Sequence, residues 1–485
     1  MADPILCGTV TRAMKRKCAA ALAFLILPFL PAAVYAESLS ALMERIDLSG
    51  FLRIRSWSAI SRTYVPGSFD TRNTYKHVNY QDLFLRNRIY LTVIPEIQVR
   101  TVLDISGNFG KSDLSMDNAN ANLIARDVYA IIRPVKEAEI SLGLMPFSLP
   151  GGFILARDAT GIQYTHTISG KKAALYIAYI KAFDDADDSF GQGSDVPDFV
   201  WDDIIFAGSR FSIGSIFRGE CYYIYEDDRF TTNKLTYDTA NFAAGLEGDG
   251  RKGSLHWVGF HGRVMTGNWY LRFGGIFNAG YIYWRNELFA FRKTDILAGL
   301  FEFETGFSIN DLKLSAVAEG ATGDPNNQNA GRSFQDIKGA HDFSFIAVDS
   351  NGGLALRGSG ESCWYGLYGC GLAFTYTLFD SFIVDFKLLH FGTMKVLYWR
   401  GEKTTWFGDE ADLGLEYRFR NILSVFLNAG GFLPQRAYNA QDSMSRSYYG
   451  YLTEVHYNDL LHDLDNHGSR SMIFEIMLGM KISYD

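Results

Sequence analysis

The sequence predicts an all-β protein whose single antiparallel sheet closes into a transmembrane barrel, and three observations lead to this prediction. Segments of about ten residues alternate apolar and polar side chains, as strands with one apolar face do. After residue 36, no apolar run approaches the roughly 20 residues that a membrane-spanning helix needs. Polar connections of two very different lengths separate the alternating segments. Since only helices and closed barrels satisfy all backbone groups in lipid, a membrane protein of this kind must be a barrel.

Residues 1–36 have the features of a signal peptide. A basic patch at 15–17 follows Met14, an apolar stretch covers 19–34, and Val34-Tyr35-Ala36 forms a small-x-small cleavage pattern. The position of the basic patch leaves a translation start at Met14 open, and an N-terminal helix or anchor is the alternative interpretation. We expect residues 37–485 to form one barrel domain in the bacterial outer membrane.

Arginines recur on one face of the first predicted strands, which cover residues 51–57, 82–93 and 97–106. The opposite face of each strand carries Leu, Ile or Val at every second position, as a lipid-facing stripe does. A solvated outer face of a soluble sheet is the alternative, but three successive strands favour a lumen. The arginines concerned are Arg53, Arg55, Arg86, Arg88 and Arg100.

Later strands place carboxylates on the face away from the apolar stripe. Arginine binds carboxylate and phosphate oxygens through its planar fork, so basic residues opposite acidic ones would orient a polar or anionic solute. The alternative is that these charges pair with one another and stiffen the wall, and both interpretations stay open. The carboxylates concerned are Glu302, Glu304, Glu319, Asp385 and Glu416.

The connections and the strand number follow from the same alternation. We expect short turns on the periplasmic side and long loops rich in Gly, Asn, Asp and Ser outside. The best strand count is 18, with 16 or 20 open, because residues 262–308 can be divided into two or four strands. The short connections are expected near 94–96, 133–138, 169–171, 213–215, 309–311, 378–380 and 420–421. The long ones are expected near 108–121, 183–202, 321–362, 393–408 and 433–469.

The final fifteen residues, Ser471 to Asp485, give the clearest single strand. Such an apolar stripe would promote aggregation in water, so we expect lipid to cover it and the first strand to pair with this one. Its apolar face consists of Met472, Phe474, Ile476, Leu478, Met480, Ile482 and Tyr484.

Charge, cysteines and motifs exclude other classes of protein. Without residues 1–36 the chain has 42 Lys and Arg against 53 Asp and Glu, a net charge of −11, which argues against nucleic-acid binding. A loop disulfide between Cys363 and Cys370 requires the chain to turn between them, which Gly366 and Gly369 permit. The chain has no HExxH, CxxC or GxSxG motif, so we predict no catalytic residues, no cofactor and no metal site.

Several stretches resemble the alginate-export family of outer-membrane porins. They are F-L-R-I-R, L-R-N-R-I-Y-L, L-S-A-V-A-E-G-A-T-G-D-P-N, and D-E-A-D-L-G-L-E-Y-R-F with N-A-G-G-F-L-P after it. The resemblance implies an 18-stranded barrel with an arginine-containing lumen, which in some members passes anionic polysaccharide outward. It also implies that Arg53, Arg55, Arg86 and Arg88 are lumen arginines and that Asp324 lies at the base of a long loop.

The sequence therefore predicts a passive outer-membrane channel for small polar or anionic solutes, with an anionic polysaccharide such as alginate as one candidate. The expected partners are the lipid bilayer, the solute and the outer-membrane barrel assembly machinery. The alternative is a barrel plugged by its long loops, 321–362 and 433–469, that acts as a surface adhesin or a structural outer-membrane protein.

Overall fold

The computed structural model describes the strands and the turns that join them. The described residues are 45–62, 75–109, 121–149, 154, 156–168, 172–181, 202–231, 251–285, 291–323, 366–399, 402–420, 422–435 and 473–484. No helix within these ranges is long and apolar enough to cross a membrane.

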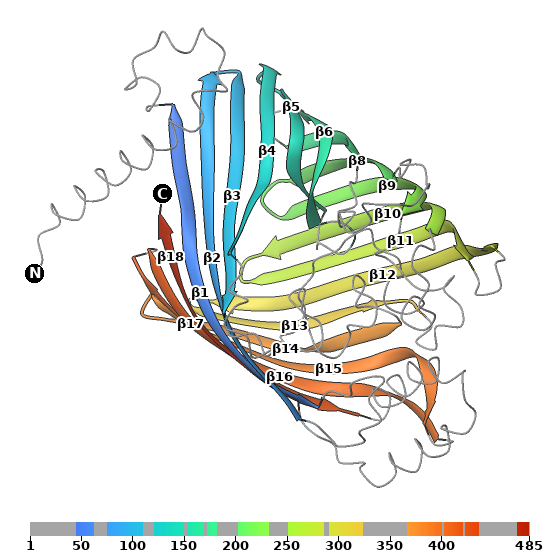
Figure 1. Cartoon of the computed structure of the whole chain (residues 1–485). Coiled ribbons are helices and arrows are strands. Elements are labelled where there is room, and N and C mark those ends of the chain that lie inside the picture. The colour runs from blue at the N-terminus through green and yellow to red at the C-terminus, as the bar shows by residue number, and fades with distance from the viewer. Residues whose placement is uncertain are drawn as a thin grey trace, which may run out of the picture.

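The described residues form 18 strands (Figure 1). In chain order they are β1 (Ile46–Arg62), β2 (Tyr75–Ile94), β3 (Ile97–Phe109), β4 (Ala121–Val135), β5 (Ala138–Ser148), β6 (Ala156–Ile168), β7 (Ala173–Lys181), β8 (Asp202–Ile213), β9 (Phe217–Thr231), β10 (Arg251–Thr266), β11 (Trp269–Arg285), β12 (Phe291–Ile309), β13 (Leu312–Ala321), β14 (Leu367–Leu378), β15 (Phe382–Trp399), β16 (Glu402–Phe419), β17 (Leu423–Pro434) and β18 (Ile473–Tyr484).

These strands make one closed antiparallel barrel. Each strand pairs with its neighbours in sequence, and β1 also pairs with β18 over eleven residue pairs, from Gly50 opposite Tyr484 to Ile60 opposite Phe474. The predicted pairing of the first and last strands is therefore confirmed, as is the count of 18. Every strand is paired on both sides over at least part of its length, which is what a sheet in lipid requires.

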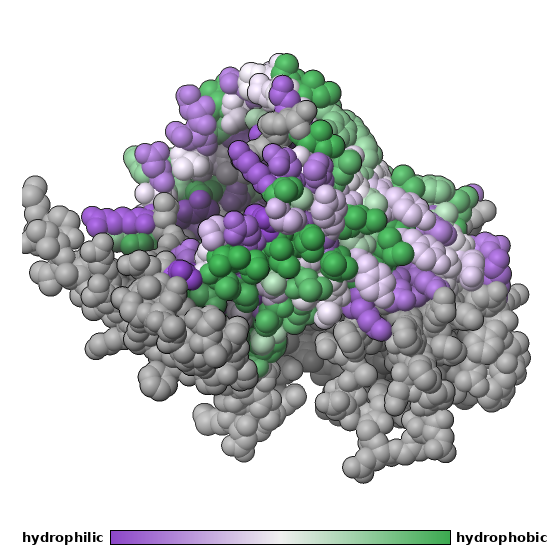
Figure 2. All heavy atoms as spheres, turned by 90° about the horizontal axis from the view of Figure 1, so that it is seen from above, coloured by the Kyte–Doolittle hydropathy of each residue, from purple (hydrophilic) through white to green (hydrophobic). Residues whose placement is uncertain are grey.

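The outer face of the barrel is apolar. Large apolar side chains at every second position of the strands are exposed, as in β18, where Phe474, Ile476, Leu478 and Ile482 are 37–53% exposed. Figure 2 shows hydrophobic residues in green on the outside of the wall and hydrophilic ones in purple around the hollow. The alternation that predicted a lipid-facing stripe thus corresponds to one continuous outer surface.

The inner face has two zones. Toward the ends that carry the long connections it is apolar and buried, with Ile180, Ile224 and Trp257 each 0% exposed. Toward the short turns it carries mostly charged and polar side chains, as Arg210 and Lys313 illustrate. Both zones belong to the same strands, so a single strand changes its inner-face chemistry along its length.

One connection differs from the sequence prediction, and one undecided region is resolved. The prediction of a long connection at 393–408 is wrong, because β15 continues to Trp399 and β16 begins at Glu402, and Trp399 pairs with Glu402. The segment contains Val, Leu, Tyr, Trp and Thr, which favour a paired strand, and its charged residues had suggested a loop. The undecided region 262–308 contains the end of β10, then β11 and most of β12, with a tight turn at Gly267 (φ 57°).

A charge on the outer face should destabilise the barrel. Phe301 on β12 is 41% exposed on that face, and an arginine near the bilayer midplane costs about 2–4 kcal/mol. We expect Phe301→Arg to lower the free energy of unfolding by that order, and Phe301→Leu to change it little. Urea unfolding in lipid vesicles measures both. Equal stabilities for the two variants would mean that this face does not contact lipid.

Candidate functional site

The five arginines predicted from the sequence lie together on the inner face of β1, β2 and β3. Pairing places Arg55 opposite Asp82 and Arg86 opposite Asp104, so two of these arginines face carboxylates of the next strand. Residues directly opposite on one face of a sheet have Cβ atoms about 5 Å apart, which is close enough for ion pairs. The register therefore decides which of the five charges are compensated.

Arg55 and Arg86 are both held in ion pairs. The Nε of Arg55 donates to both carboxylate oxygens of Asp82, at 2.8 and 3.0 Å. Arg86 binds Asp104 through two parallel hydrogen bonds, from Nε at 2.8 Å and from Nη2 at 2.6 Å. Asp82 and Asp104 are only 7% and 5% exposed, so these pairs are part of the wall. For these two arginines the wall-stiffening interpretation applies.

Arg53, Arg88 and Arg100 form no ion pair within the described part of the chain. The guanidinium of Arg53 lies 5.2 Å from the centre of the Phe84 ring. Arg100 lies 5.0 Å from the Tyr90 ring, and its Nη1 donates to the hydroxyl of Tyr129 at 3.4 Å. Aromatic rings hold a guanidinium without cancelling its charge. These three arginines therefore keep a positive charge on the inner face.

The predicted carboxylates lie on the inner face of β12 to β16, and most have partners. Glu416 accepts two hydrogen bonds from Arg418, at 2.8 and 2.7 Å, and Asp385 accepts one from the hydroxyl of Thr375 at 2.6 Å. Glu319 is 4% exposed and lies directly opposite Glu302, which is 5% exposed. These carboxylates lie on β12 to β16, and the strand order places this part of the wall apart from the arginines of β1 to β3.

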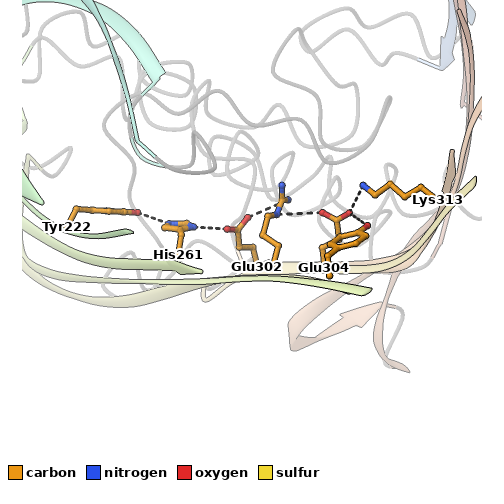
Figure 3. Close-up of polar contacts among 7 residues, drawn as sticks. Tyr222, His261, Glu302, Glu304 and Lys313 are labelled. Carbon is orange, nitrogen blue, oxygen red and sulfur yellow. Dashed lines mark hydrogen bonds and ion pairs between the residues drawn. The ribbon is translucent and has the colours of Figure 1, made fainter. Parts of the chain in front are cut away.

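A chain of polar contacts crosses five strands of the inner wall (Figure 3). The hydroxyl of Tyr222 lies 3.0 Å from His261 Nε2, and His261 Nδ1 lies 2.6 Å from Glu302 Oε1. Arg272 then lies 3.6 Å from carboxylate oxygens of both Glu302 and Glu304. Glu304 also accepts hydrogen bonds from Lys313 Nζ at 3.0 Å and from the Tyr270 hydroxyl at 2.6 Å. The chain fixes Arg272 between two carboxylates.

The sequence reading missed the charged residues of β8 to β11. Those toward the short turns are Arg210, Arg218, Glu220, His261, Arg263 and Arg272. The alternation in F-R-G-E-C-Y and F-H-G-R-V could have assigned these side chains to one face, since each stretch places its polar residues at every second position. The undecided division of residues 262–308 left Arg263 and Arg272 without an assigned face.

The proposed disulfide has one end within the described residues. Cys370 lies on β14 and is half-buried, and Cys363 lies outside the described residues, as does Asp324. The bridge and the role of Asp324 therefore stay predictions.

The pairing of Arg86 with Asp104 is testable by a double-mutant cycle. We expect the single variants Arg86→Ala and Asp104→Ala to be destabilised by amounts that do not add. The expected coupling energy is about 1–3 kcal/mol. Either single substitution already breaks the charge-assisted pair, so the second substitution has no pair left to break. Urea unfolding of the four proteins in vesicles measures it. A coupling energy near zero would mean that this pair does not stabilise the wall.

Comparisons with known proteins identify the fold. No protein-family model matches the sequence, and no curated protein is similar to it in sequence. Among solved structures, OccAB3 of Acinetobacter baumannii is similar with a TM-score of 0.53 and 9% identity, over 90% of this chain and 99% of that one. The outer membrane protein opdK of Pseudomonas aeruginosa matches with 0.51 and 12% identity over 90% and 99%. A BenF-like porin from Pseudomonas fluorescens Pf-5 matches with 0.50 and 11% identity over 90% and 98%.

The chain thus has the closed barrel fold of outer-membrane porins. At identities of 9–12%, the similarity to these structures supports the fold but does not indicate which solute this protein binds. A closed 18-stranded sheet with an apolar outer face is a protein of the bacterial outer membrane. The resemblance to the alginate-export family in particular stays a prediction.

Proposed function

We propose that this protein is a passive outer-membrane channel for small polar or anionic solutes. The observation that carries the proposal is the group Arg53, Arg88 and Arg100, three guanidiniums on adjacent inner-face strands without a carboxylate partner among the described residues. A barrel of this strand number has room for an aqueous passage. Positive groups along such a passage attract anions and raise their local concentration.

The proposed mechanism needs no cofactor and no chemical step. A carboxylate or phosphate group would exchange part of its hydration shell for bidentate contacts with one guanidinium after another. The rings of Phe84 and Tyr90 beneath Arg53 and Arg100 would keep these guanidiniums from collapsing onto the acidic residues of the wall. Because each acid group of the solute would contact one guanidinium at a time, the solute would leave as readily as it binds, which conduction requires.

The solute class follows from this chemistry and from the resemblance to the alginate-export family. A uronate polysaccharide carries one carboxylate per sugar and would engage several arginines together. A small organic acid would engage one or two. We therefore propose anionic solutes in general and treat uronate oligomers as the candidates to test first.

Ion selectivity in planar bilayers tests the proposal. Replacing Arg53, Arg88 and Arg100 together by Gln should shift the reversal potential in a KCl gradient toward cation preference. The matched control is Arg86→Gln with Asp104→Asn, which removes one charge of each sign from an existing pair and should leave the selectivity unchanged. Uronate oligomers should block the wild-type current at lower concentration than neutral oligosaccharides.

Two outcomes would count against the proposal. A folded triple variant with the wild-type anion preference would remove the three arginines from the conduction path. A folded wild-type barrel that never conducts but binds a surface ligand would instead favour the adhesin or structural alternative.

A further inference from the structure

Three arginines form an unusual row on the inner face of β9, β10 and β11. Arg263 pairs directly with Arg218 on one side and with Arg272 on the other. Adjacent strands lie about 4.8 Å apart, so the three Cα atoms span about 10 Å across the strands. Like charges directly opposite each other destabilise a sheet, so this row opposes the stability of the barrel.

The charge of this row is only partly compensated. Arg272 lies 3.6 Å from carboxylate oxygens of Glu302 and Glu304. Arg218 and Arg263 form no ion pair with any residue that the structure describes. The guanidinium of Arg263 lies 6.0 Å from the centre of the Tyr270 ring, a contact that leaves its charge in place. Two neighbouring guanidiniums are therefore available to a ligand.

The row borders a recess in the inner wall. The recess has a volume of about 730 Å³ and opens widely. Its charged lining consists of Lys172, Arg210, Arg218, Arg263, Arg272, Glu220 and Glu302, so cations exceed carboxylates by three. Arg210 and Glu220 already pair at 3.0 Å, and the hydroxyl of Tyr176 donates to the same Glu220 oxygen at 2.7 Å. The surplus of positive charge is thus concentrated on Arg218, Arg263 and Lys172.

This recess is separate from the arginines that carry the proposed conduction path. In a ring of 18 strands, β10 lies half the circumference away from β1. The recess also lies at the ends of β8 to β11 that carry the short turns, near Gly214 and Gly267. A solute at the recess therefore contacts a different wall from one at Arg53.

We propose that the recess is a binding site for solutes with two or more acid groups, of the dicarboxylate and tricarboxylate class. A single carboxylate can neutralise one guanidinium, but the charge of the neighbouring guanidinium would remain uncompensated. Two linked carboxylates can bind Arg218 and Arg263 together, and each can form the bidentate pair that arginine favours. The volume exceeds what a monocarboxylate needs and falls within the range of small-molecule sites. The inference deepens the proposed anion channel and rests on it for its role in transport.

Binding is tested with citrate and acetate as probes at equal ionic strength. Citrate should stabilise the folded barrel against urea in vesicles at a concentration at least about tenfold lower than acetate does. Arg263→Gln and Arg218→Gln should each raise the citrate concentration required by about tenfold or more. Arg133→Gln, an arginine outside the recess that pairs with Glu139, should not change it. Without citrate, Arg263→Gln should be at least as stable as the wild type, because the repulsions with Arg218 and Arg272 are both gone.

The stability measurement does not require a current, so it separates this inference from the channel function. Citrate-dependent stabilisation without conductance would support the site and contradict the channel. Equal effects of citrate and acetate on the wild type would overturn the inference. So would a folded Arg263→Gln protein with the wild-type response to citrate, whether or not the protein conducts.

Discussion

Deletion of β18 should abolish the barrel altogether. The strand forms eleven residue pairs with β1 and ten with β17, so its loss exposes the backbone edges of both neighbours. In lipid each unsatisfied backbone group costs several kcal/mol, which far exceeds the net stability of a typical protein. We expect a chain without Ile473–Tyr484 to fail to insert into vesicles and to lose the heat-dependent shift in electrophoretic mobility of a folded barrel.

A smaller change where β18 pairs with β1, the closing seam of the barrel, provides the control. The side chain of Tyr484 crosses β1 at Gly50, and its hydroxyl donates to the side-chain oxygen of Asn87 and lies 3.4 Å from the backbone oxygen of Arg86. Tyr484→Phe removes these contacts and should weaken the seam slightly without preventing closure. A Cβ at Gly50 would lie 2.0 Å from that same backbone oxygen, so Gly50→Val should be much worse. A β18-deleted chain that still inserts and resists heat would contradict the closed barrel.

Loss of Glu302 should destabilise the wall more than loss of Asp385, another of the predicted carboxylates. Its carboxylate accepts the 2.6 Å contact with His261 and lies beside Arg272, and its side chain is only 4% exposed. Glu302→Ala would leave a buried histidine and an arginine without that partner. Breaking a buried pair of this kind costs about 3 kcal/mol. Glu302→Gln should cost less, because its amide oxygen can still accept a hydrogen bond.

Asp385→Ala is the matched comparison for Glu302→Ala. Asp385 is exposed on the inner face and accepts one hydrogen bond, from Thr375. Its removal should change the free energy of unfolding by much less than the removal of Glu302, since water can replace it. Urea unfolding in vesicles orders the three variants. A Glu302→Ala protein as stable as Asp385→Ala would mean that the chain from Tyr222 to Lys313 does not hold the wall.

Local alternation was enough to predict the closed barrel, and it assigned the arginines of the first strands to the face away from the apolar stripe. The stripe of β18 and the faces of Arg53 and Arg86 depend only on the period of two along one strand, which a single sequence displays. The prediction failed at 393–408, where charged residues next to Gly401 suggested a loop but the flanking aromatic and β-branched residues pair. Local charge was there a weaker signal than strand-forming residues.

The partners of the charges were not predictable, because they depend on register between strands. Asp104 was on the expected face, but only its place opposite Arg86 shows that it cancels that charge. The row of Arg218, Arg263 and Arg272 requires the registers of three strands, and a slip of one residue would break it. Sequence alone thus pointed to the wall of β1 to β3, and pairing reveals the second arginine group on β9 to β11.

The reversal potential of the wild-type protein tests the proposed function most directly. Purified barrel that shows the heat-dependent mobility shift would be inserted into a planar bilayer under a KCl gradient. The expected result is stepwise conductance with a reversal potential that indicates anion preference, because the proposed path passes arginines that have no carboxylate partner among the described residues. Folded protein that inserts without conducting, or conducts with clear cation preference, would contradict the account.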